Sequence, residues 1–240
     1  MIQLTTACVS SVDESKGNTS NLLFSGQILP ERNAGLNGAP SLKLEPGAAC
    51  TAAVFDGAGV GANKAAYVAA GAFRAASDTL HTTEDLESIY TRIHNDICAA
   101  SAAQDDLPLA ASAVAACVGG DQLALACLGS CRAYLMRGKS LYLLSRESAD
   151  VAPRATPPAP GDGAMLGADA VPPFTVKGTL LSGDQLLLCT GALAAALDAR
   201  EILRVLLEGE SAAAALQLLV RRAGSGRGDI AAVLLRADEA

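Results

Sequence analysis

The chain of 240 residues is poor in aromatic and charged side chains. Aromatic residues make up 3% of it and tryptophan is absent, so its core must be built mainly from Ala, Leu and Val. Charged residues make up only 18% and hydrophobic residues 50%, which excludes a generally disordered chain. Small aliphatic side chains favour close packing of helices on sheets. The length is sufficient for one mixed α/β domain with a sizeable core.

A concentrated basic surface and a long apolar run are also lacking. The formal net charge is −7, whereas a protein that binds the nucleic-acid backbone needs clustered Lys and Arg. The nearest basic cluster, Arg221, Arg222 and Arg227, is interpreted as the solvated end of a helix. No apolar run approaches the roughly 18–20 residues of a membrane helix. We therefore predict neither a nucleic-acid nor a membrane partner.

The seven cysteines show no CxxC or CxxH spacing. Several lie in apolar, strand-like runs, where cysteine behaves as a small hydrophobic residue. Their odd number, together with the lack of a signal peptide, predicts free thiols and a cytoplasmic location. Cys131 stands beside Arg132, which could activate a thiol, but a buried strand cysteine is the favoured interpretation.

The order of apolar runs and turn signals predicts alternating groups of strands and helices. Thr82 followed by Asp85 has the spacing of a capping box at the start of a helix. Segment 147–175 holds most of the prolines and predicts a flap or long loop. Short glycine turns within 113–144 predict an antiparallel meander. The expected strands are 22–28, 48–55, 113–118, 123–128, 133–136, 141–144, 185–190 and 230–236, the expected helices are 63–80, 83–101 and 193–222 with a break near Gly209, and a loop is expected over 31–46.

The run from Val54 to Gly61 is the most informative motif. An apolar strand leads into Asp56 and a glycine-rich turn, which places a carboxylate at a strand end where a metal ion or phosphate can reach it. A structural alternative is that Asp56 caps the turn before the helix that starts near Asn63. The glycines do not form a nucleotide loop, because no Lys-Ser/Thr follows and the GxGxxG pattern is incomplete.

Five motifs in a consistent order resemble those of the metal-dependent serine/threonine phosphatases of the PP2C type. This resemblance implies a single domain over 1–240 with an α/β sandwich fold, in which two packed β-sheets are flanked by helices. The motifs are Asp56-Gly57-Ala58-Gly59-Val60, Gly129-Ser130-Cys131-Arg132-Ala133-Tyr134-Leu135, Leu144-Ser145-Arg146-Glu147, Met165-Leu166-Gly167 and Ser182-Gly183-Asp184.

The chemistry of that family needs two or more Mg²⁺ or Mn²⁺ ions, which are held mainly by carboxylates and water. A water that bridges two such ions becomes the nucleophile. By resemblance, Asp56 and the carbonyl of Gly57 match the first metal-binding pair, and a one-residue slip would bring Asp229 to another metal position. At the other positions where the family has acids, this chain has Ser20, Ser130, Gly191 and Gly228.

Two further positions of the family are altered. Its phosphate-binding arginine has no clear match, Lys16 being the closest basic residue, and the histidine that some members carry as a general acid is Ala58 here. His81 and His94 are interpreted as surface helix residues and Asp184 as a turn residue.

The losses predict no cofactor, or one weakly bound Mg²⁺ or Mn²⁺ ion. The function they favour is that of a pseudophosphatase, an inactive phosphatase scaffold that binds or regulates a protein or phosphoprotein partner. The alternative is an active phosphoserine/phosphothreonine phosphatase whose unorthodox metal site uses Asp56 and Asp229.

Overall fold

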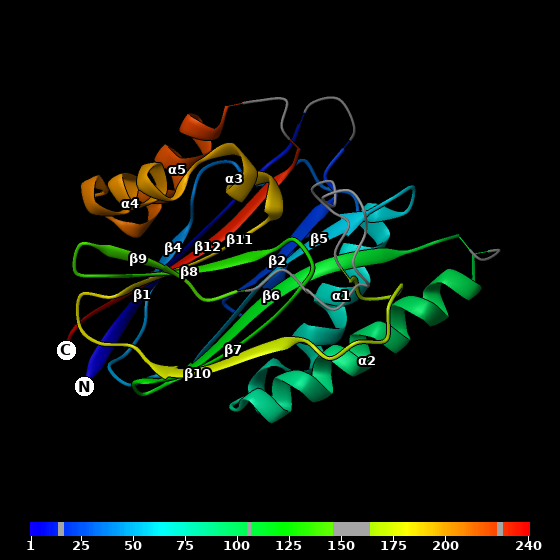
Figure 1. Cartoon of the computed structure of the whole chain (residues 1–240), viewed down its shortest axis with the longest axis horizontal. Coiled ribbons are helices and arrows are strands. Elements are labelled where there is room, and N and C mark those ends of the chain that lie inside the picture. The colour runs from blue at the N-terminus through cyan, green and yellow to red at the C-terminus, as the bar shows by residue number, and fades with distance from the viewer. Residues whose placement is uncertain (14–16, 105–106, 146–163, 225–227) are drawn as a thin grey trace, which may run out of the picture.

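The structure, a computed structural model, describes residues 1–13, 17–104, 107–145, 164–224 and 228–240. Two six-stranded sheets pack face to face, and helices cover the outer face of each sheet (Figure 1). All strand pairings between the named strands are antiparallel. The predicted sandwich of two sheets flanked by helices is therefore confirmed. Most of the predicted flap, 147–163, lies outside the described residues, as does Lys16.

The first sheet has the strand order β4-β1-β12-β11-β8-β9. The strands β1 and β12 are the longest in the sheet and pair along their whole length, from Ile2 opposite Glu239 to Ser11 opposite Ile230. The strand bounds are β1 Ile2–Ser11, β4 Ser41–Lys43, β8 Arg132–Arg137, β9 Ser140–Leu143, β11 Gln185–Cys189 and β12 Ile230–Glu239.

The second sheet has the strand order β10-β7-β6-β5-β2-β3. Its centre is the pair β5 and β6, in which Cys50 lies opposite Val118 and Ala58 opposite Ala110. The strand bounds are β2 Ser20–Phe24, β3 Gln27–Ile28, β5 Cys50–Ala58, β6 Ala110–Gly119, β7 Gln122–Leu128 and β10 Phe174–Thr179.

Helices α1 and α2 cover the second sheet, and α3, α4 and α5 cover the first (Figure 1). The predicted capping box starts α2, since the Thr82 side chain accepts from the Asp85 N–H and the Asp85 carboxylate accepts from the Thr82 N–H. The predicted break at Gly209 is confirmed as the end of α4. The bounds are α1 Ala62–Ala76, the 3₁₀ helix η1 Ser77–Thr79, α2 Thr83–Ala102, α3 Gly191–Ala196, α4 Ala199–Glu208 and α5 Ala212–Ala223.

Three apolar clusters hold these four layers together, one between the sheets and one under each helical layer. Because both faces of each sheet are covered, the central strands are apolar on both faces. Alanines dominate the contact of α1 with its sheet, with Phe55 and Phe73 packed edge-to-face at a centroid distance of 5.8 Å. The buried Tyr90 hydroxyl donates to the carbonyl of Ala126 at 3.0 Å. This is the Ala-rich core that the shortage of aromatics predicts.

Several expected elements need correction. The single strand predicted over 22–28 is a hairpin, because Ser25 and Gly26 both have positive φ and reverse the chain between β2 and β3. The meander predicted within 113–144 is two hairpins in different sheets, β6–β7 and β8–β9. The missed strands are β1, β4 and β10.

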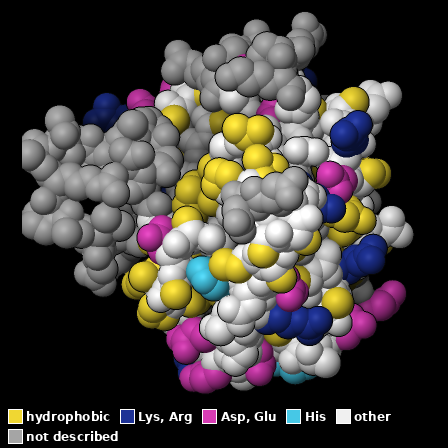
Figure 2. Space-filling view, turned by 90° about the vertical axis from the view of Figure 1, so that its right-hand side faces the viewer, with side chains coloured by type: hydrophobic (Ala, Val, Ile, Leu, Met, Phe, Trp, Pro, Cys, Tyr) yellow, Lys and Arg dark blue, Asp and Glu magenta, His cyan; other side chains and the backbone are white. Residues whose placement is uncertain are grey.

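The surface carries interspersed charges. On the face shown in Figure 2, hydrophobic side chains gather in the upper middle, whereas Lys/Arg and Asp/Glu side chains alternate toward the lower and right-hand edges. Within the described part of the chain, no helix combines the length and the apolar character needed to span a membrane.

Candidate functional site between the ends of β5 and β12

The residues predicted from the PP2C resemblance meet at one end of the sandwich. Asp56 lies within β5 rather than at its end, because β5 continues to Ala58. In the strand register, Asp56 is opposite Ser20 on β2 and opposite Ser112 on β6. Directly opposed side chains in antiparallel strands share one face of the sheet. The three residues therefore form a polar row, and it faces the other sheet because Val54, two residues before Asp56, lies in the cluster between the sheets.

Ser130 extends this row toward the first sheet. It lies where the chain crosses from β7 to β8, and both its backbone N–H and its hydroxyl donate to the Ser112 hydroxyl oxygen at 3.1 Å. A Cβ on Gly191, the first residue of α3, would lie 2.9 Å from the Ser130 side chain. Gly191 and Ser130 are therefore in contact, and a larger residue at either position would require the other to move.

Gly57 allows β5 and α1 to approach closely. A Cβ at this position would overlap the backbone of Ala62, so only glycine fits without a shift of the main chain. The Gly57 N–H donates to the Thr19 carbonyl at 2.9 Å. Gly61, not Asp56, is the N-cap of α1, and no hydrogen bond joins the Asp56 carboxylate to the described residues of the turn that Asp56 was expected to cap.

Asp229, just before β12, is buried and fully engaged by hydrogen-bond donors. Its Oδ1 accepts from the backbone N–H of Asp13 at 2.7 Å. Its Oδ2 accepts from the backbone N–H of Thr19 at 2.6 Å and from the Thr19 hydroxyl at 2.7 Å. Its backbone carbonyl accepts from the Thr190 hydroxyl at 3.1 Å. Asp229 thus ties residues 13 and 19, on either side of 14–16, to the start of β12.

Asp56 has the opposite environment. It is partly buried, and its carboxylate has no hydrogen-bond donor among the described residues. Burial, and secondarily the negative charge of Asp229, raise the pKa of Asp56 to about 7. A carboxylate in this state favours either a proton or a cation, whereas Asp229 already has its negative charge balanced by three donors.

The oxygen ligands at this end of the sandwich do not fit a cluster of two hard cations. Mg²⁺ and Mn²⁺ prefer octahedral oxygen sites with several carboxylates, and two ions need more of them than one. Among the described residues, no group of three or more His, Cys, Asp or Glu side chains is arranged to hold a metal ion. Asp56, with the hydroxyls of Ser20 and Ser112 beside it, offers one carboxylate to one ion. The assignment of Asp56, Gly57 and Asp229 as metal ligands stays a prediction.

Gly228 is notable for its backbone conformation, and Asp184 for its turn and its ion pair. Gly228 has φ of +101°, in the region that side chains with a Cβ rarely adopt. Asp184 is in the predicted turn, where its backbone N–H donates to the Leu181 carbonyl. The sequence gives no sign of its partner: the buried Asp184 carboxylate accepts from Arg137 Nη2 at 2.6 Å and from Arg137 Nε at 2.9 Å.

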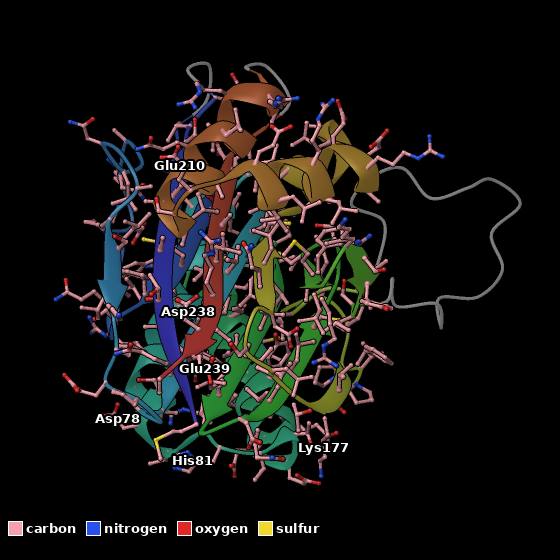
Figure 3. All side chains as sticks on the ribbon, turned by 90° about the vertical axis from the view of Figure 1, so that its left-hand side faces the viewer. Asp78, His81, Lys177, Glu210, Asp238 and Glu239 are labelled. Atoms are coloured by element: carbon pink, nitrogen blue, oxygen red, sulfur yellow. The ribbon has the colours of Figure 1, made fainter. Side chains whose placement is uncertain are left out.

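The cysteine and histidine predictions are resolved by burial and position. Cys131 is fully buried, and burial raises its thiol pKa well above the usual value, as expected for a strand-like structural cysteine. His81 precedes α2 rather than lying in it, at the end of the molecule where β12 finishes with Asp238 and Glu239 (Figure 3). His94 is in α2, but it is half-buried and hydrogen-bonded.

Sequence reasoning missed Ser112 and Thr19. Ser112 had a detectable signal, since it is the only hydroxyl in the apolar run 110–118. Thr19 had none, because its role depends on the fold bringing it to Asp229.

No protein-family model matches the chain, and no curated protein matches it. Solved structures do match. The catalytic domain of the serine/threonine phosphatase PstP of Mycobacterium tuberculosis, solved with two manganese ions, has a TM-score of 0.78 and 19% identity, with 100% of both chains covered. PppA of Pseudomonas aeruginosa, a regulatory component of a type VI secretion system, has a TM-score of 0.75 and 20% identity over 98% of this chain and 97% of that chain. A serine/threonine phosphatase of S. agalactiae has a TM-score of 0.74 and 16% identity, with coverage of 98% and 100%.

The fold is that of the PP2C-type serine/threonine phosphatases, which confirms the resemblance seen in the motifs. At these identities the likeness is one of fold.

Proposed function

We propose that this protein is a phosphatase scaffold that does not turn over and that binds or regulates a protein or phosphoprotein partner. The observation that carries the proposal is the set of residues available as metal ligands where the end of β5 and the start of β12 meet. Hydroxyls and glycines stand at Ser20, Ser130, Gly191 and Gly228, and the Asp229 carboxylate is occupied by N–H and O–H donors.

The one remaining carboxylate ligand, Asp56, is not sufficient for the reaction of the PP2C-type phosphatases. Two bound ions normally activate a bridging water and neutralise the charge that develops on the phosphoryl oxygens. A single partly buried carboxylate supplies neither a bridging position nor a second ion. Uncatalysed phosphomonoester hydrolysis is among the slowest known reactions, so loss of this activation leaves essentially no rate.

The partner part of the proposal is supported by the similar folds. PppA is described as a key regulatory component of a secretion system. A chain that retains this fold over its length while altering its acidic positions keeps a surface for recognition without the chemistry.

Turnover assays test the first part. We expect negligible hydrolysis of p-nitrophenyl phosphate and of phosphothreonine peptides, with or without Mn²⁺, and no further loss in Asp56→Ala. The matched control is Asp238→Ala, which changes an exposed acid at the far end of β12. Robust Mn²⁺-dependent turnover that Asp56→Ala abolishes and Asp238→Ala preserves would establish the active-enzyme alternative.

Binding assays test the second part. A fluorescent phosphothreonine peptide and its unphosphorylated twin, titrated with the protein in the presence of a chelator, separate recognition of phosphate from recognition of peptide. We expect saturable binding with no change in peptide mass. Binding of the phosphorylated form alone indicates a phosphoprotein partner, and equal binding of both forms indicates a protein partner recognised by its sequence.

A further inference from the structure

Cys98 is the one exposed cysteine of the chain, and it does not stand alone. It lies one helical turn after His94 on α2, so the two side chains share a face of the helix. The Cys98 Sγ atom is 3.6 Å from His94 Nε2 and 3.6 Å from the carbonyl oxygen of Gly167. Gly167 also donates its backbone N–H to His94 Nδ1 at 3.1 Å. The three residues therefore form a closed hydrogen-bonded ring.

The Gly167 N–H decides which nitrogen of His94 carries the proton. A ring nitrogen that accepts a hydrogen bond has no proton, so in the neutral imidazole the proton is on Nε2. Nε2 then donates toward Cys98 Sγ. The same argument disfavours a metal site at this pair, since a metal would need a free lone pair on Nε2. His94 is instead placed to donate to a thiolate.

Gly167 is tightly seated against α2. It has φ of +86°, and a Cβ there would collide with Ile97 and with the Leu109 carbonyl. Its neighbour Leu166 is buried and pairs with Ala111 through two backbone hydrogen bonds of 2.9 and 3.0 Å. Ala111 in turn lies opposite Gly57 in the second sheet. Cys98 thus contacts a segment that is hydrogen-bonded to the strands of the candidate site.

We propose that Cys98 is a site of reversible thiol–disulfide modification, with His94 as the residue that stabilises its thiolate and Gly167 as the contact that the modification displaces. The proposal is independent of whether the protein hydrolyses phosphoesters.

The reaction is an exchange with a low-molecular-weight disulfide. The Cys98 thiol gives its proton to solvent, and the thiolate attacks one sulfur of the disulfide. A new S–S bond forms at Cys98 while the original S–S bond breaks, and the leaving thiolate departs with the electron pair and takes a proton from water. The number of disulfide bonds is unchanged, so no separate oxidant is consumed.

The reaction is expected to select Cys98 over the other cysteines because their thiols are more buried. Burial raises the pKa of Cys50 to about 11 and of Cys8, Cys117 and Cys189 to about 12. A thiol with such a pKa is a thiolate far less often at neutral pH, and only the thiolate attacks.

Intact-mass and peptide-mass measurements with 2-hydroxyethyl disulfide, a neutral probe, test the site. At pH 7 we expect one adduct, on Cys98, that forms at least about tenfold faster than an adduct on any other cysteine. In concentrated urea the seven rates should converge. Adducts that form on several cysteines at similar rates in the folded protein, or no adduct on Cys98 when N-acetylcysteine reacts under the same conditions, would overturn the assignment.

The role of His94 is tested by His94→Gln, with His81→Gln as the matched control, since His81 lies away from Cys98 at the start of α2. We expect His94→Gln to slow the Cys98 reaction about threefold or more in the folded protein, with no change in urea and none in His81→Gln. The urea rate keeps the test valid if His94→Gln perturbs folding. An unchanged or faster rate in folded His94→Gln would refute the role of His94.

Displacement of Gly167 is tested by hydrogen exchange. The adduct should raise the exchange rate of the amides of 165–169 several-fold in the wild-type protein, and Cys98→Ser treated with the same probe should show no change. Equal exchange with and without the adduct would refute the displacement.

Discussion

Asp56 and Asp229 lie at the same end of the sandwich, but the protein surrounds their carboxylates in opposite ways. Asp229 accepts hydrogen bonds from Asp13 and from both donors of Thr19, and it holds these two residues against the start of β12. Asp56 has no donor among the described residues, and burial raises its pKa to about 7. Asp229 therefore has a structural role, whereas the charged form of Asp56 is expected to reduce stability. Four predictions test this contrast.

The largest effect is expected for Asp229→Ala. The change leaves three donors from Asp13 and Thr19 without an acceptor in a buried place. Each unsatisfied buried donor costs about 1–3 kcal/mol, and because the Thr19 hydroxyl can rotate toward another acceptor we expect a loss of about 3 kcal/mol in the free energy of unfolding. Urea denaturation monitored by circular dichroism measures it. Asp238→Ala is the control and should change stability by less than about 0.5 kcal/mol. An Asp229→Ala protein as stable as Asp238→Ala would remove the structural role.

Asp56→Asn should instead increase the free energy of unfolding at high pH. The folded state holds the Asp56 proton up to about pH 7, whereas the unfolded chain releases it near pH 3.9. Between those pH values the folded state binds more protons, so its stability falls as the pH rises, and the loss is complete above about pH 7.

The full shift corresponds to about 4 kcal/mol, which solvent access to this partly buried group reduces. We therefore expect Asp56→Asn to increase the free energy of unfolding by about 1–3 kcal/mol at pH 8 and to leave it nearly unchanged at pH 4. The measurement is urea denaturation at both pH values with a chelator present. A loss of stability at pH 8 would mean that the Asp56 carboxylate is stabilised by a partner.

A smaller effect is expected for Gly228→Ala. The added Cβ would have an ordinary contact of 3.5 Å with Ala192, so the cost comes from the positive φ alone, about 1–2 kcal/mol. Gly71→Ala, in the middle of α1 with open space around the new Cβ, is the control and should gain about 0.5–1 kcal/mol. Thermal denaturation compares the two. A neutral Gly228→Ala would mean that an acid at this position could be restored without strain.

The smallest effect is expected from Mn²⁺. One carboxylate and two hydroxyls hold a hard cation weakly, so at a metal concentration near the dissociation constant the gain is about 0.4 kcal/mol. Calorimetry should show at most one weak site, weaker still in Asp56→Ala and unchanged in Asp238→Ala. Tight binding of two ions would contradict the contrast between Asp56 and Asp229, because it would require Asp229 to release its present donors.

The main architecture could be predicted from the sequence, because its signals are local. Long apolar runs mark β5, β6 and β12, and the box of Thr82 and Asp85 marks α2. β4 and β10 could not be predicted in this way. They are short or partly exposed, and their extended conformation depends on pairing with β1 and β7.

The candidate site was predictable where a motif carries it and unpredictable where the fold makes it. Asp56 follows from its glycine-rich context, but the donors that occupy Asp229 come from residues more than two hundred positions away in the chain. The crossing between sheets after β7 is hidden within the predicted meander, since short glycine turns look alike whether a strand returns to its own sheet or enters another.

The pairing of β1 with β12 also affects how the protein folds during synthesis. β12 lies between β1 and β11 in the middle of its sheet, yet it follows both of them in the chain and leaves the ribosome after them (Figure 1). Until it emerges, the facing edges of β1 and β11 have open backbone groups and apolar neighbours, which is the state most exposed to aggregation. Contacts between such distant segments also form slowly. The first sheet can therefore close only after β12 has emerged and inserted between β1 and β11.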